Sequence, residues 1–209
     1  MPPIVLSVDG NIGAGKTTFL MALAKACPDY DIVLEPVADW MTLSGPDGKS
    51  LLELFYEDKR RWAYTFQTCA LLTRIKSLKA ALASTKNSVI ITERSVLTDR
   101  HMFAEMLRSS GDIGGIEWAV YNTLFDECAA PLPLSGIIYL TTDAPVSKER
   151  IMQRARKGEE RIMLEYLQAL DEQHARWISS TSLPVLRLNT DDFGANFSEV
   201  RSWVSKFSS

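Results

Sequence analysis

The chain has 209 residues, 46% of them hydrophobic and 23% charged, so we expect a single domain over residues 1–209 with one sizeable core. A formal net charge of −3 without a block of like charge disfavours a nucleic-acid partner. No apolar run approaches the roughly 20 residues of a membrane span, so no membrane partner is expected. Three widely spaced cysteines and no signal-like or transit-like segment favour a cytoplasmic protein acting on small molecules.

The first apolar run, residues 4–7, leads into a glycine-rich stretch that reads G-x-x-x-x-G-K-T over residues 10–17. Residues 19–26 then have apolar positions at helical spacing, which is the strand-loop-helix context of a phosphate-binding loop. The alternative is a glycine-rich turn before an ordinary helix, and the correct spacing of every motif position disfavours it. We expect nucleotide phosphates to be bound by Gly10, Asn11, Gly13, Ala14, Gly15, Lys16, Thr17 and Thr18.

Four more short apolar runs follow, at residues 32–34, 89–91, 137–140 and 185–188, and helix-like sequence separates them. This alternation predicts an α/β fold whose five strands form a parallel sheet with helices on both faces. Ligands of such sheets lie beyond the carboxyl ends of the strands, so the residues after each run are candidates for chemistry.

Carboxylates follow the second and third runs. Glu35 could orient and deprotonate a hydroxyl that attacks a γ-phosphate, and a surface ion pair or loop cap is an equal alternative. Glu93 is placed to reach a Mg²⁺ ion together with the Thr17 hydroxyl, and Arg94 to reach the transferring phosphoryl group. The structural alternative is that Glu93 and Arg94 only form a salt-bridged turn.

A long helix is expected over residues 59–83, with Gln67 and Arg74 on one side among apolar neighbours. These two side chains suggest a pocket wall, but the residues alone favour solvated side chains at the edge of the apolar face. Further helices are expected over residues 98–107, 117–129, 164–178 and 196–207. The helix that begins at Pro145 ends in an arginine-rich stretch with a glycine, which fits a mobile cationic lid or, alternatively, simple helix-dipole partners.

These segments together resemble the deoxynucleoside kinase family. The resemblance rests on the phosphate-binding loop, Glu-Pro-Val-Ala-Asp-Trp at 35–40, Phe-Gln-Thr-Cys-Ala-Leu-Leu-Thr-Arg at 66–74, Glu-Arg-Ser-Val-Leu-Thr-Asp-Arg at 93–100, and Arg-x-Arg-x-x-Glu at 154–159. It implies a P-loop kinase fold with an arginine-rich lid at about 150–163, and a homodimer formed through a helix bundle. It also implies ATP or another NTP as donor, Mg²⁺, and a deoxynucleoside acceptor in nucleotide salvage.

The resemblance also implies roles for particular residues. Glu35 is the general base for the sugar 5′-hydroxyl, Arg94 steadies that oxygen, and Lys16 contacts the donor. For the acceptor, Trp40, Phe66 and Phe103 are expected to form aromatic walls around the base, and Gln67 to bind the edge of the base. Tyr56 and Glu159 are expected to bind the sugar 3′-hydroxyl. For the donor, Arg150, Arg154 and Arg156 are expected to bind the phosphates. Asp192 and Phe193 correspond, more weakly, to the loop that holds the donor's base.

Arg74 and Asp99 resemble the polar pair of family members that act on deoxycytidine or purine deoxynucleosides, so we expect these to be preferred over thymidine. Two departures concern loop geometry: Lys59 stands where a proline is common, and Gly158 replaces an acidic lid residue. A nucleoside monophosphate kinase similar to thymidylate kinase is an alternative, although an ionised phosphate acceptor would need no base such as Glu35. A nucleotide-binding switch is a further alternative, but the sequence lacks its guanine motif.

Overall fold

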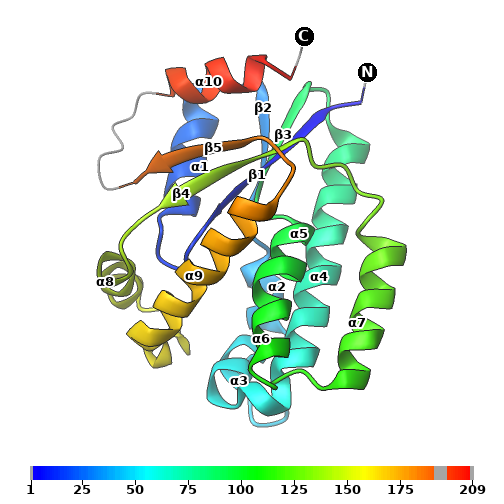
Figure 1. The fold of residues 1–209 in the computed structure, drawn as a ribbon, viewed down its shortest axis with the longest axis vertical. Helices are drawn as coiled ribbons and strands as arrows, with labels where there is room; N and C mark the ends of the chain where they lie inside the picture. Colours follow the sequence, from blue (N-terminus) through cyan, green and yellow to red (C-terminus); the bar gives the residue numbers. More distant parts are fainter. Residues whose placement is uncertain (1, 191–196, 208–209) are drawn as a thin grey trace.

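A computed structural model describes residues 2–190 and 197–207. Within these residues, five parallel strands form one sheet in the order β2-β3-β1-β4-β5 (Figure 1). The strands are β1 (Ile4–Gly10), β2 (Tyr30–Val33), β3 (Val89–Glu93), β4 (Gly136–Thr141) and β5 (Val185–Asn189). The α/β fold and the five-stranded parallel sheet expected from the sequence are confirmed.

The register of the sheet brings two functional segments together. Val8 of β1 pairs with Glu93 at the end of β3, and the Arg94 N–H donates to the Val8 carbonyl at 3.0 Å. The central strands are rich in valine and isoleucine because helices cover both of their faces. The phosphate-binding loop after β1 therefore starts beside the residues that follow β3.

Helices cover the sheet on both faces, as Figure 1 shows. One face packs against α1 (Lys16–Ala26) and α10 (Ser198–Ser205) in a core that includes Leu20 and Val200. The other face packs against α4 (Lys59–Ser84), α8 (Ala144–Arg154) and α9 (Leu164–Ser180). No helix among the described residues is long and apolar enough to cross a bilayer.

The remaining helices lie toward the strand ends, in the lower half of Figure 1. They are α2 (Val37–Thr42), α3 (Leu51–Glu57), α5 (Val96–Thr98), α6 (Glu105–Ser109), α7 (Gly115–Cys128), the π-helix η1 (Asp99–Ala104) and the 3₁₀-helix η2 (Glu159–Arg161). The sequence analysis missed α2 and α3. It also expected one helix over residues 98–107, whereas the structure has a π-helix between two short α-helices. The three cysteines are free, as expected.

Candidate active site

The phosphate-binding loop joins β1 to α1 through residues 11–15. Gly13 and Gly15 both have a φ of +83°, and a Cβ on Gly13 would lie 2.3 Å from the Ser147 carbonyl oxygen of α8. Only glycine fits this left-handed position against a neighbouring backbone. The tight loop leaves Ala14 buried and opens toward a cavity on its outer side.

Lys16 is buried at the first position of α1. Its ammonium donates to the carbonyls of Asn11 at 2.7 Å and Gly10 at 3.2 Å. Burial lowers the pKa of Lys16 to about 7, with Arg94 acting in the same direction. Glu93, Glu35 and Asp9 oppose this shift, and a bound polyphosphate would add further negative charge and favour the charged form of Lys16.

Thr17 and Glu93 lie together behind the loop. The Thr17 hydroxyl donates to both carboxylate oxygens of Glu93, at 2.9 Å and 3.0 Å. Hard oxygen donors of this kind suit Mg²⁺, which is usually held by one or two carboxylates plus substrate phosphates rather than by a complete protein cage. The described residues contain no cluster of three or more His, Cys, Asp or Glu side chains that could hold a metal ion.

Glu35 follows β2 and meets three cationic groups. Arg74 donates from Nη2 to Glu35 Oε1, Arg94 Nη1 is 3.7 Å from the same oxygen, and Lys16 adds a further charge. Burial alone would raise the pKa of Glu35, but Arg94, Arg74 and Lys16 outweigh it and hold the pKa at about 2. Glu35 is therefore an ionised carboxylate at neutral pH.

Arg94 occupies a strained backbone position directly after β3. Its φ is +62°, and its side chain is 3% exposed. The guanidinium donates to the Gly10 carbonyl at 3.1 Å and lies 4.8 Å from the centre of the Phe103 ring. The strained backbone holds the Arg94 guanidinium between the phosphate-binding loop and Glu35. In this position it can stabilise negative charge that develops on a transferring phosphoryl group.

Arg74 is buried, in contrast to the solvated position that its sequence neighbourhood favoured. Its Nε lies 2.9 Å from Asp99 Oδ2, and its Nη1 donates to the Glu93 carbonyl at 3.1 Å. Asp99 begins the π-helix η1, a type of helix often found at functional sites. Burial raises the pKa of Asp99 to about 6, although Arg74 opposes this shift. Arg74 and Asp99, the polar pair of the family resemblance, thus form a buried ion pair in the structure.

A cavity of about 170 Å³, here called the aromatic cavity, lies beyond Glu35. Trp40 and Phe66 meet edge to face with ring centres 5.3 Å apart, and Phe55 stacks on Phe66 at 4.5 Å. Gln67 is 2% exposed, and its Oε1 has no hydrogen-bond partner among the described residues, so this acceptor is available to a ligand. The cavity is also lined by Tyr56, Arg74, Arg94, Asp99, Phe103 and Glu159.

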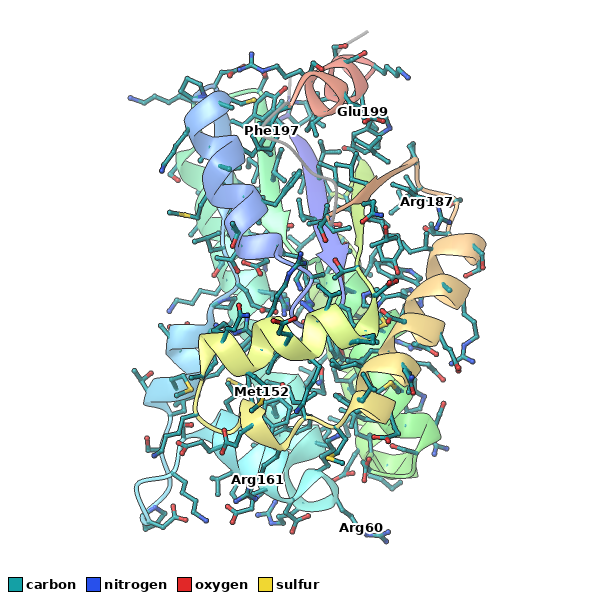
Figure 2. The ribbon with its side chains drawn as sticks, turned by 90° about the vertical axis from the view of Figure 1, so that its left-hand side faces the viewer. Arg60, Met152, Arg161, Arg187, Phe197 and Glu199 are labelled. Carbon is teal, nitrogen blue, oxygen red and sulfur yellow. The ribbon has the colours of Figure 1, made fainter. Side chains whose placement is uncertain are left out.

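The lid reaches this cavity through Glu159 in η2. Both oxygens of the buried Glu159 carboxylate are occupied: Arg154 donates to Oε2 at 2.6 Å and 3.1 Å, and Arg156 donates to Oε1 at 2.9 Å. Figure 2 shows α8 crossing in front of the strand ends, with Met152 on it and Arg161 on the turn that follows. The lid arginines are thus bound to the carboxylate that was assigned to the sugar.

A second cavity of about 730 Å³, here called the P-loop cavity, lies on the other side of the loop. It is lined by Gly13, Ala14, Gly15, Lys16, Thr17, Thr18, Glu93, Arg150, Arg154 and Arg156, with Phe19, Ala22, Thr190 and Phe197. Five residues line both cavities: Lys16, Thr17, Glu93, Arg154 and Arg156. Two ligands bound on either side would therefore meet at these five side chains.

Some expected contacts differ. The Asn11 amide donates to the Leu167 carbonyl at 2.9 Å and to Asp171 at 2.6 Å, so its side chain is turned toward α9 and is not among the lining residues of the P-loop cavity. Asp192 and Phe193 lie outside the described residues. Phe55 and Tyr166 line the aromatic cavity and were not predicted.

A model of the family described as deoxynucleoside kinase matches residues 6–207. The chain belongs to the deoxynucleoside kinase family. It is 37% identical to deoxycytidine kinase 2 of Gallus gallus over 200 residues, covering 86% of this chain and 76% of the relative. It is 34% identical to the Homo sapiens deoxycytidine kinase over 233 residues, covering 97% and 90%.

The mitochondrial deoxyguanosine kinase of Xenopus laevis is 34% identical over 215 residues, covering 90% of this chain and 81% of that protein. The chain is thus a phosphotransferase of the deoxynucleoside kinase family, with a nucleoside triphosphate as donor and a deoxynucleoside as acceptor. This family membership supports neither the monophosphate kinase nor the nucleotide-binding switch.

Proposed function

We propose that this deoxynucleoside kinase transfers the γ-phosphate of Mg-ATP to the 5′-hydroxyl of deoxycytidine or a purine deoxynucleoside in preference to thymidine. The observation that carries the base preference is the buried Arg74–Asp99 ion pair, 2.9 Å long, in the wall of the aromatic cavity. A guanidinium and a carboxylate can meet a ring nitrogen and an amino group, and their pair occupies space that a 5-methyl group would need. Nearby Gln67 offers its free acceptor oxygen to an amino group at the base edge.

The proposed reaction takes place where the two cavities meet. The acceptor's 5′-oxygen bonds to the γ-phosphorus as the bond from that phosphorus to the β–γ bridging oxygen breaks and ADP leaves. The hydroxyl proton passes to Glu35, which the neighbouring Arg94 holds close to the P-loop. Mg²⁺, held by Thr17 and Glu93, would neutralise charge on the phosphates.

The remaining roles follow from position. Arg150, Arg154 and Arg156 line the P-loop cavity and can bind the donor phosphates, while Tyr56 and Glu159 line the aromatic cavity and can bind the sugar 3′-hydroxyl. For this, Glu159 must share its oxygens between the two lid arginines and the sugar. A single domain and a cytoplasmic location stay predictions.

The test is a product analysis with Mg-ATP and a panel of four deoxynucleosides and their monophosphates. We expect deoxynucleoside 5′-monophosphate and ADP to form in equal amounts, with deoxycytidine or a purine deoxynucleoside consumed fastest. Phosphorylation of the monophosphates instead would contradict the proposed acceptor.

We also propose a homodimer formed through α4 and α7. Leu72 on α4 and Ile116 and Val120 on α7 are exposed, at 46%, 82% and 44%, and α4 and α7 lie side by side at the right of Figure 1. Ile116 and Val120 lie one turn apart on α7, and neighbouring exposed apolar side chains of this kind are a candidate interaction surface. Light scattering should give twice the mass of the chain, and Ile116→Lys with Val120→Lys should give a monomer. A monomeric parent protein would contradict the dimer.

A further inference from the structure

The lid turn lies against α3 on the outer side of the aromatic cavity. Lys157 Nζ is 2.9 Å from Glu53 Oε1, and Arg161 Nη1 is 3.8 Å from Glu57 Oε1. Gly158 has a φ of +91°, and a Cβ there would lie 3.2 Å from the Glu53 Cα. Figure 2 shows Arg161 beside the cyan helices that include α3. The lid turn can approach the backbone of α3 this closely because residue 158 has no side chain.

A second contact joins α4 to α9. Lys59, the first residue of α4, places its ammonium 3.5 Å from the centre of the Tyr166 ring in the first turn of α9. Tyr166 in turn lines the aromatic cavity. Lys59 and Gly158 are the two departures from the family pattern that the sequence analysis noted. Both lie at contacts between residues 53–59 and residues 157–166.

We propose that Glu53 and Lys157, with Gly158 between the two backbones, form a latch that positions Tyr56 and Glu159 for the acceptor's sugar. Glu53 precedes Tyr56 by three residues on α3, so the two lie one turn apart on the same helix. Lys157 precedes Glu159 by two residues in the lid. The latch therefore sets the distance between the two walls of the sugar site. This inference rests on the proposed function, because that function identifies the ligand as a deoxynucleoside.

Hydrogen bonds from Ser50 hold the Glu53 carboxylate in one orientation. Its Oε2 accepts from the Ser50 backbone N–H at 2.9 Å and from the Ser50 hydroxyl at 2.8 Å, in the capping box of α3. Its Oε1 is then left facing Lys157. The ion pair with Lys157 and the bonds from Ser50 hold the pKa of Glu53 at about 2, so the carboxylate stays charged at neutral pH.

Lys157 and Glu53 are positioning residues, since they line neither cavity and so act through their neighbours. Loss of the latch should weaken acceptor binding more than catalysis, because Arg154 and Arg156 are bonded directly to Glu159 and do not need Lys157. The expected sign is a higher KM for the deoxynucleoside with kcat and the KM for ATP close to those of the parent.

The test compares Glu53→Gln, Lys157→Met and the double variant with the parent enzyme. Glutamine keeps the capping box of α3, and methionine keeps an unbranched apolar stem close to that of lysine while removing the charge. Each single change should raise the acceptor KM about two- to fivefold, the effect of one partly exposed ion pair, and the double change should raise it no further. Lys157→Arg should restore the parent value, and Lys79→Met, on the exposed face of α4, should leave it unchanged.

Amide hydrogen exchange of residues 157–162 gives a readout that does not depend on activity. Exchange should be faster in Glu53→Gln than in the parent and unchanged in Lys79→Met. Equal exchange in all variants, an unchanged acceptor KM, or additive effects in the double variant would overturn the latch. If exchange responds as expected but the parent phosphorylates no deoxynucleoside, the contact stands and the acceptor assignment is wrong.

Discussion

Glu35 is a weak base by its pKa and a well-placed one by its geometry. Its pKa of about 2 makes the carboxylate a poor proton acceptor, so little driving force comes from basicity. Arg74 and Arg94 instead fix one of its oxygens beside Gly10 of the P-loop. This arrangement agrees with phosphoryl transfer, in which positioning and charge stabilisation supply most of the catalysis.

The first prediction is that Glu35→Gln lowers kcat toward the lower end of the ~10²–10⁴-fold range of general-base contributions, because Glu35 is a weak base, while deoxynucleoside binding is largely kept. The amide preserves the shape of the side chain and removes the proton acceptor. Steady-state kinetics and a direct binding measurement on the same variant provide the check. A kcat within a few-fold of the parent across neutral pH would show that Glu35 is not the base.

Lys16 gives a second prediction, on pH. Its pKa of about 7 in the free enzyme means that the ammonium is lost as pH rises through this value, whereas a bound triphosphate favours the charged form. The affinity for a non-hydrolysable ATP analogue should therefore fall by up to about tenfold per pH unit above about pH 7, measured by calorimetry. In Lys16→Met the affinity should be low and should lack this pH dependence. A parent affinity that stays constant over the same range would contradict the shifted pKa.

At the scale of single elements, the phosphate-binding loop gives a third prediction. Gly13→Ala places a Cβ 2.3 Å from the Ser147 carbonyl oxygen at a φ of +83°, so either the loop or α8 must move. We expect a loss of about 1–3 kcal/mol in the free energy of unfolding and weaker donor binding. Thermal unfolding and calorimetry measure the two effects. Gly115→Ala is the matched control, because a Cβ there meets no atom within 4 Å; equal stability of the two variants would refute the argument.

Sequence patterns located all five strands, because each strand contains a short run of consecutive apolar residues that can be recognised without knowledge of distant contacts. The π-helix η1 was beyond such reasoning, since periodicity cannot separate a π-turn from the α-helical turns on either side of it. Helix α3 could have been found: Ser50 and Glu53 form a capping box just before the apolar residues Leu54 and Phe55.

The site shows a similar division. Lys16, Thr17 and Glu93 follow strands and could be placed from the sequence, and the structure brings them together. Burial of Arg74 could not be inferred from its helix, because Arg74 is kept buried by Asp99, which is 25 residues further along the chain. Only the resemblance to the deoxynucleoside kinase family connected these two positions before the structure did.

At the scale of the whole molecule, a shared set of side chains lies between two cavities at the ends of the strands. The P-loop cavity and the aromatic cavity share Lys16, Thr17, Glu93, Arg154 and Arg156. Glu159 pairs with Arg154 and Arg156, which line both cavities. In the proposed function the donor binds these arginines and the acceptor's sugar binds Glu159, so each ligand should influence the binding of the other through the lid.

The most direct measurement is the ratio of kcat/KM for deoxycytidine, deoxyadenosine and deoxyguanosine to that for thymidine, in the parent and in Arg74→Met with Asp99→Ala. Both residues must change together, because removing one leaves the other buried and unpaired. Absolute rates will fall in the double variant since Arg74 also binds Glu35, so the ratio is the informative quantity. We predict a parent ratio that favours at least one of the three over thymidine, and a shift toward thymidine in the double variant. A parent enzyme that prefers thymidine over all three would contradict the account of base selection.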